Sequence, residues 1–200
     1  MAHVSQADFT RAARGAPILA GQGSEIEPII GGISSIARCA VRDVHRKSPE
    51  AAMSYFNGGT AKWLLLGGSA AAAVRTYHDS LAQYIAWDGG SGSADLDVGF
   101  RKPAIVYGPG DSVRALAHVV RDLGGGQREV RILLWDDLSL NAQSAEMIAL
   151  PLVERVDSEY GQGSTTEVGV WQVAQPQQIT VLPAAAEARR TDVQTLLAEL

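Results

Sequence analysis

The sequence predicts an α/β or α+β domain: a mixed sheet flanked by helices, with a helical extension at the N-terminus. Short apolar runs bounded by turn residues indicate strands of a central sheet at 63–66, 96–100 and 130–135. Longer stretches with helical spacing separate them. The chain has 200 residues, 46% of them hydrophobic and 20% charged, which fits one soluble globular domain with a proper core.

Charge and cysteine usage narrow the function classes. The net charge of −5 argues against broad, charge-driven binding of nucleic acid, although a local basic patch stays open. Cys39 is the single cysteine, so no internal disulfide forms. Residues 1–8 lack the pattern of a secretory signal, and no apolar run is long enough for a membrane span. We therefore expect a cytoplasmic protein without a membrane partner.

The first 47 residues form the predicted helical extension. Residues 5–14 indicate a short helix capped by Ser5. Residues 28–47 have the spacing of an amphipathic helix, with Arg38, Arg42 and Arg46 on a face of their own. This arginine stripe is interpreted as a solvated helix face, with contact to phosphates as the alternative.

The main domain, residues 48–200, begins with a helix at Ser48-Pro49-Glu50 that is expected to stop at Gly58-Gly59. The apolar run at 62–66 then predicts a strand. The turn Gly67-Gly68-Ser69 follows this strand and opens a helix.

A second strand carries Asp95 and Asp97 around Leu96. Alternate side chains of a strand share a face, so the two carboxylates are expected to lie side by side. Such a pair repels itself and is usually stabilised by a cation, most often Mg²⁺.

The remaining elements are assigned from periodicity and turn residues. Gly108-Pro109-Gly110 is interpreted as a plain turn rather than a phosphate-binding loop. Pro151 is expected to divide residues 141–156 into a helix and a strand at 152–156. Helices are predicted at 113–123, where Gly124-Gly125-Gly126 ends the helix, and at 184–200. Strands are predicted at 129–135 and 167–174, and residues 176–182 form either a second short strand or the lead-in to the last helix.

Residues 66–70 together with 93–97 resemble the nucleotidyltransferase fold, in which an apolar strand, a glycine turn and a helix precede an Asp-x-Asp strand. The version here looks most like the minimal and abortive-infection-type nucleotidyltransferase toxins. Residues 189–197 look like the closing helix of those proteins. The segment from Asp79 to Gly92 is longer than in compact members.

The resemblance implies metal-dependent transfer of a nucleotidyl group from a nucleoside triphosphate to a hydroxyl of RNA or protein, with an antitoxin as a further partner. Asp95 and Asp97 would bind Mg²⁺ or Mn²⁺. Gly67, Gly68 and Ser69 would approach the nucleotide phosphates.

Two further features depart from the family pattern. The lysine that usually opens the closing helix is missing, and Arg189 is its only substitute. A third carboxylate would be Glu129 or Asp136, and neither falls cleanly on the expected place.

Two other function classes stay open. One is a non-catalytic assembly protein, such as a phage or secretion-machine component, which the many glycines and the missing lysine suit. The other is a different α/β enzyme or binding module that uses the Gly108-Pro109-Gly110 turn. Binding of Mg²⁺ or Mn²⁺ at Asp95 and Asp97 would distinguish a nucleotidyltransferase, which requires the metal, from the assembly protein, which does not. No Ser-His-Asp arrangement and no zinc spacing is visible.

Overall fold

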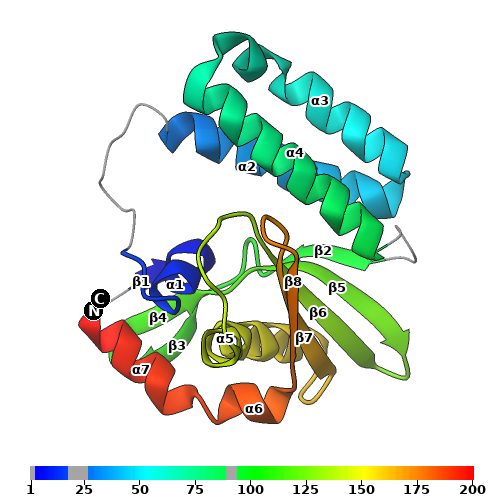
Figure 1. Cartoon of the computed structure of the whole chain (residues 1–200). Helices are drawn as coiled ribbons and strands as arrows, with labels where there is room; N and C mark the ends of the chain where they lie inside the picture. Colours follow the sequence, from blue (N-terminus) through cyan, green and yellow to red (C-terminus); the bar gives the residue numbers. More distant parts are fainter. Residues whose placement is uncertain (1–2, 18–26, 89–93) are drawn as a thin grey trace.

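The α+β class predicted from the sequence is confirmed in the computed structural model, which describes residues 3–17, 27–88 and 94–200. Its elements stack in layers around a mixed sheet (Figure 1). Helices α2 (Glu27–Arg46), α3 (Pro49–Leu66) and α4 (Gly68–Asp88) cover one face. Helix α5 (Ala142–Tyr160) covers the other face, with α6 (Pro183–Glu187) and α7 (Arg190–Glu199) beside it.

The main sheet has five strands in the order β2-β5-β6-β7-β8. Strands β6 and β7 are parallel and are joined through α5, whereas the other pairs are antiparallel. The predicted strands around 129–135 and 167–174 are confirmed, and of the two alternatives for 176–182 the strand is the one that forms. The bounds are β2 (Ala94–Val98), β5 (Ala117–Gly124), β6 (Gln127–Leu134), β7 (Thr165–Gln172) and β8 (Gln177–Val181).

A smaller sheet gathers the N-terminus and the middle of the chain. Strand β1 (His3–Ser5) pairs in parallel with β4 (Asp111–Arg114), which pairs with β3 (Ile105–Gly108). Ser5 caps α1 (Gln6–Ala12), as predicted. Gly108-Pro109-Gly110 is the tight turn between β3 and β4, in keeping with the plain-turn interpretation. The described part of residues 1–47 thus contributes to this sheet through β1 and to the helical layer through α2.

The predicted strand at 62–66 is wrong, because these residues form the last turns of α3. The helix also continues through Gly58-Gly59, where it was expected to stop. Both facts have one cause: a Cβ on Gly59 would lie 3.1 Å from the Ile36 side chain, and one on Gly32 would lie 2.8 Å from the Trp63 ring. The glycines let α2 and α3 approach closely, and this packing outweighs the low helix propensity of glycine.

The predicted helix at 113–123 is also wrong, because this stretch forms β4 and β5. Ala115, Ala117 and Val119 are all buried, which is the period of two expected for a strand. The spacing of Leu116, Val119, Val120 and Leu123 mimicked a helix. The three glycines at 124–126 have positive φ angles and form the hairpin turn into β6 rather than a helix end.

The C-terminal third departs from the prediction at two points. Helix α5 runs unbroken through Pro151, so the strand expected at 152–156 does not form. Leu150 and Leu152 are buried on either side of the proline, and this burial offsets the lost backbone hydrogen bond. The single helix expected at 184–200 is instead two, α6 and α7.

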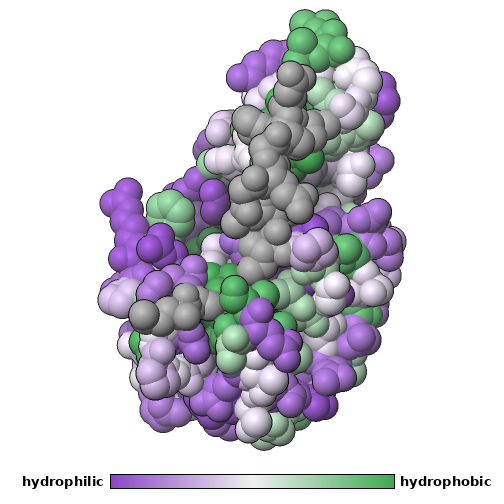
Figure 2. Space-filling view, turned by 90° about the vertical axis from the view of Figure 1, so that its left-hand side faces the viewer, coloured by the Kyte–Doolittle hydropathy of each residue, from purple (hydrophilic) through white to green (hydrophobic). Residues whose placement is uncertain are grey.

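The outer end of the helical layer is apolar. Figure 2 shows hydrophobic surface there, where α3 ends in three exposed leucines at 64–66. Leu65 is the most exposed of the three, at 89%. Within the described ranges, no helix has the length and apolar character that crossing a membrane requires.

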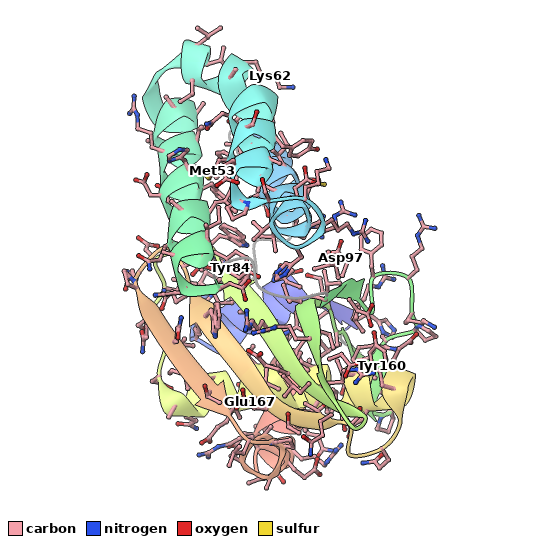
Figure 3. The ribbon with its side chains drawn as sticks, turned by 90° about the vertical axis from the view of Figure 1, so that its right-hand side faces the viewer. Met53, Lys62, Tyr84, Asp97, Tyr160 and Glu167 are labelled. Carbon is pink, nitrogen blue, oxygen red and sulfur yellow. The ribbon has the colours of Figure 1, made fainter. Side chains whose placement is uncertain are left out.

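A buried group of charged side chains joins the helical layer to the sheet. Arg131 of β6 donates to Asp88 at the end of α4 and, at 2.5 Å, to Glu129. His45 Nε2 of α2 lies 3.8 Å from Asp88 and 2.5 Å from the Tyr84 hydroxyl. Figure 3 shows Tyr84 at this junction. The contacts fix the C-terminal end of α4 to β6 and to α2.

Candidate functional site

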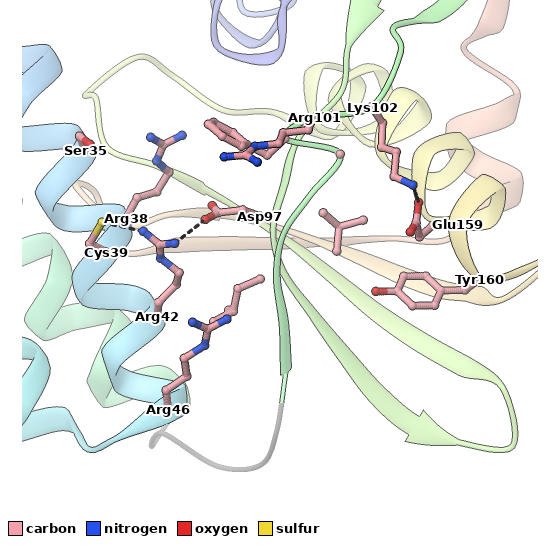
Figure 4. A pocket seen from close by; sticks show the side chains of 14 residues that line it. Ser35, Arg38, Cys39, Arg42, Arg46, Asp97, Arg101, Lys102, Glu159 and Tyr160 are labelled. Carbon is pink, nitrogen blue, oxygen red and sulfur yellow. Dashed lines mark hydrogen bonds and ion pairs between the residues drawn. The ribbon is translucent and has the colours of Figure 1, made fainter.

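A cleft of about 580 Å³ opens between α2 and the edge strand β2. Its walls are α2, the end of β2 with the turn that follows it, and the C-terminal end of α5 (Figure 4). Edge strands lack a neighbour on one side, so the position of β2 in the sheet leaves room for this opening.

Helix α2 contributes three arginines to the cleft. Arg38, Arg42 and Arg46 follow one another at intervals of four residues, and such positions share one face of a helix. The apolar side of α2, which includes Ile33 and Val41, belongs to the core shared with α3 and α4. That packing turns the arginine stripe toward β2, as Figure 4 shows, so the stripe is not simply a solvated face.

The turn after β2 forms the opposite rim. Asp97 has a φ of 56°, which is uncommon for a residue other than glycine, and Gly99 has a φ of 97°. The Phe100 amide donates to the Asp97 carbonyl at 3.1 Å. A Cβ on Gly99 would lie 2.3 Å from the Ala115 carbonyl oxygen, so only glycine fits there. This tight turn places Phe100, Arg101 and Lys102 along the cleft.

The two carboxylates of the cleft already have cationic partners. Asp97 Oδ2 lies 3.6 Å from Arg42, and Glu159 lies 3.1 Å from Lys102. Arg42 also donates to Cys39 Sγ at 2.7 Å, and this hydrogen bond, supported by Asp97, raises the pKa of Arg42.

Three further arginines line the cleft beside these two ion pairs: Arg38, Arg46 and Arg101. The Arg38 guanidinium lies 5.9 Å from the centre of the Phe100 ring. Arg46 and Arg101 form no ion pair with any residue that the structure describes. The cleft therefore carries an excess of positive charge in a chain whose net charge is −5.

Asp95 and Asp97 do not lie side by side as the alternation of a strand predicts. Asp95 Oδ2 accepts a hydrogen bond from the Tyr160 hydroxyl of α5 at 2.6 Å, whereas Asp97 faces Arg42 of α2. Leu96 packs with the core under the helical layer and Val98 with the core under α5. The positive φ of Asp97 breaks the alternation, so each carboxylate has a different environment.

The different partners of Asp95 and Asp97 add no support to the expected Mg²⁺ or Mn²⁺ site. Among the described residues, no group of three or more His, Cys, Asp or Glu side chains is placed to hold a metal ion. The metal-bridging role that the family resemblance implies therefore stays a prediction from the sequence.

The other expected nucleotide-binding residues lie far from β2. Gly67, Gly68 and Ser69 join α3 to α4 at the outer end of the helical layer (Figures 1 and 3). Helix α4 has 21 residues, so roughly 30 Å of helix separates them from its end beside β2. Arg189 is the N-cap residue that precedes α7, and it donates to Glu146 at 2.6 Å and to Asp192 at 3.2 Å. The structure brings neither group to the aspartates.

Both candidates for a third carboxylate have arginine partners. Glu129 lies between Arg131 and Arg121 in the buried charged group. Asp136 accepts two hydrogen bonds from the Arg14 guanidinium, at 2.6 and 2.7 Å. These pairs hold elements of the fold together. The segment 89–93, which ends the expected insertion, lies outside the described residues.

The cleft uses residues that the sequence displayed without identifying their role. The arginine stripe of α2 was visible as a repeat of four, and Arg101-Lys102 was visible as a basic pair after a strand. The arginine stripe and Arg101-Lys102 come to line one cleft only because the opposite side of α2 packs on α3 and α4. Tyr160 joins them from 58 positions after Lys102, which no local pattern indicates.

The chain matches none of the protein-family models, curated proteins or solved structures to which it was compared.

Proposed function

We propose that the protein binds a phosphate-bearing ligand in the cleft between α2 and β2. The observation that carries this proposal is the convergence of four arginines and a lysine on one opening whose two carboxylates already have partners. An anion entering the cleft meets positive charge that no described carboxylate neutralises.

Arginine favours phosphate over most other anions. The planar guanidinium donates two parallel hydrogen bonds to a phosphate and keeps its charge at every physiological pH. Arg46 and Arg101 are exposed and have their donors available, while Arg42 is oriented by Asp97 and Cys39. Partial enclosure by protein lowers the local dielectric and strengthens these contacts.

The size and lining of the cleft suit an organic phosphate. Its volume of about 580 Å³ lies within the range of small-molecule sites. The Phe100 side chain is 54% exposed, which offers an apolar surface beside the cations. A nucleotide has both a phosphate group and a flat apolar ring, so it is the class of ligand that uses the whole lining.

Nucleotidyl transfer remains a prediction from the sequence. The cleft supports its nucleotide-binding part through a different set of residues, with Asp97 as the shared member. The arrangement of Asp95 and Asp97 gives no support to its metal-dependent step. The assembly-protein alternative predicts no specific response to phosphates.

Isothermal titration calorimetry with inorganic pyrophosphate and with nucleoside triphosphates, each with and without Mg²⁺, tests the proposal. We expect binding without metal, and at least about a tenfold loss of affinity in Arg38→Gln/Arg46→Gln because two charged contacts are removed. Arg75→Gln, an exposed arginine of α4 outside the cleft, is the matched control. Undetectable binding to every phosphate, or equal affinity in the double variant, would refute the proposal. Binding that requires Mg²⁺ would restore the nucleotidyltransferase reading.

A further inference from the structure

The spacing of the arginines bears on which phosphate ligand the cleft selects. Arg38 and Arg46 are eight residues apart on one face of α2, which places them about 12 Å apart along the helix axis. Adjacent phosphates of a diphosphate or triphosphate share a bridging oxygen and are therefore close together. Successive phosphates of a nucleic-acid strand are separated by a sugar, and such a strand reaches all three arginines.

Aromatic rings accompany the cationic row. Phe100 is more than half exposed and lies beneath the Arg38 guanidinium, and Tyr160 also lines the cleft with Arg128 4.8 Å from its ring centre. A basic groove with exposed aromatic rings is the usual design of sites for single strands, because unpaired bases stack on the rings. In a duplex the bases already stack on one another.

The overall charge of the chain favours a short contact. A net charge of −5 repels an extended polyanion, so attraction is confined to the few phosphates inside the cleft. We infer that the cleft binds a short single-stranded segment of nucleic acid, with its phosphates along Arg38, Arg42 and Arg46 and a base on Phe100. This inference rests on the proposed function and names the ligand class of the same site.

The inference sets the salt dependence of binding. Three neutralised phosphates of a single strand give a slope of about −2 for the logarithm of the association constant against the logarithm of salt concentration. Removing one arginine reduces the magnitude of that slope by about 0.7. A ligand that contacts one arginine gives a slope near −0.7 from the outset.

Fluorescence anisotropy with fluorescein-labelled eight-nucleotide oligo-dT and oligo-U measures these quantities on the full chain. We expect the slope of about −2 for the wild type and a smaller slope for Arg46→Gln. Loss of base stacking in Phe100→Ala is expected to weaken binding by about tenfold to a hundredfold, with Phe100→Tyr restoring most of it. Arg75→Gln is the control and should behave as the wild type. Urea unfolding of each variant verifies that the fold is intact.

The outcomes separate the two proposals. If pyrophosphate binds but the oligonucleotides bind no more tightly and with a slope near −0.7, the inference is overturned and the proposed function stands. If neither binds, both are overturned. Equal affinity for a duplex of the same length, or an unchanged affinity in Phe100→Ala, would also overturn the single-strand assignment.

Discussion

Replacing Arg131 with methionine is expected to destabilise the protein strongly. The Arg131 side chain is 4% exposed and its main partner, Asp88, is 0% exposed. The guanidinium also lies 4.2 Å from the centre of the Trp171 ring. Methionine fills a similar volume without charge, so the substitution removes the ion pair and leaves most of the packing.

The expected cost follows from what remains around Asp88. Glu129 keeps Arg121 at 3.3 Å, so its charge stays paired. Asp88 loses its closest cation and keeps the more distant His45 Nε2 at 3.8 Å, while its carboxylate stays out of water. Removing one partner of a buried pair typically costs about 3–5 kcal/mol of unfolding free energy, and we expect a value in this range.

Urea unfolding followed by tryptophan fluorescence measures the change. The double variant Asp88→Asn/Arg131→Met should recover most of the loss, because it removes the buried negative charge together with its closest cation. Lys47→Met is the matched control: its pair with Asp43 is exposed, and its removal should cost less than about 0.5 kcal/mol. A loss below about 1 kcal/mol in Arg131→Met would refute the view that a dry ionic contact joins the helical layer to the sheet.

Three further predictions concern other parts of the fold. Burial, with Arg38 nearby, lowers the pKa of His118 to about 4, below its usual value of 6.5, and Nδ1 accepts from the Leu133 amide. The neutral ring therefore stabilises the fold fully above pH 6.5. This contribution to the unfolding free energy falls by up to about 1.4 kcal/mol per pH unit as the pH drops toward 4. His118→Asn should flatten the pH dependence of the unfolding free energy, measured with urea, over this range. Gly99→Ala should cost about 1–3 kcal/mol by urea unfolding, since its φ is positive and the Ala115 carbonyl lies where the Cβ would be; a neutral result would contradict the described turn. Leu65→Glu should change stability by less than about 0.5 kcal/mol, whereas a buried strand at this position would lose several times more.

The sequence was sufficient for elements whose local signals agree. Helix α2 has an unambiguous apolar stripe, α1 begins after a capping serine, β6 has Val130, Ile132 and Leu134 at alternate positions, and β7 is rich in β-branched residues. Each of these was predicted within a few residues of its bounds.

The errors occurred where a local signal had two physical meanings. Gly58 and Gly59 were interpreted as a helix end. A glycine also allows two helices to pack closely, and here Gly59 of α3 contacts Ile36 of α2. Pro151 read as a break, although burial on both sides keeps α5 intact. Deciding between such meanings requires the tertiary partner, which a single sequence does not display.

The candidate site was predictable only in its parts. The arginine stripe and the aspartates were identified, but the strand alternation that paired Asp95 with Asp97 fails at one residue with a positive φ. The arginine stripe was interpreted as a solvated face. The apolar side of α2 packs on α3 and α4, and this packing turns the arginines toward β2. The two sides of the cleft meet only after that packing is known.

The alkylation rate of Cys39 tests the central claim most directly. Cys39 is the single cysteine of the chain, lines the cleft and contacts Arg42, so its reaction with iodoacetamide reports on the cleft alone. A phosphate ligand that occupies the arginines should slow alkylation in proportion to its binding, and Arg38→Gln/Arg46→Gln should require at least about ten times more ligand for the same protection. An alkylation rate that saturating pyrophosphate, nucleotide and oligonucleotide all leave unchanged would contradict phosphate binding in the cleft.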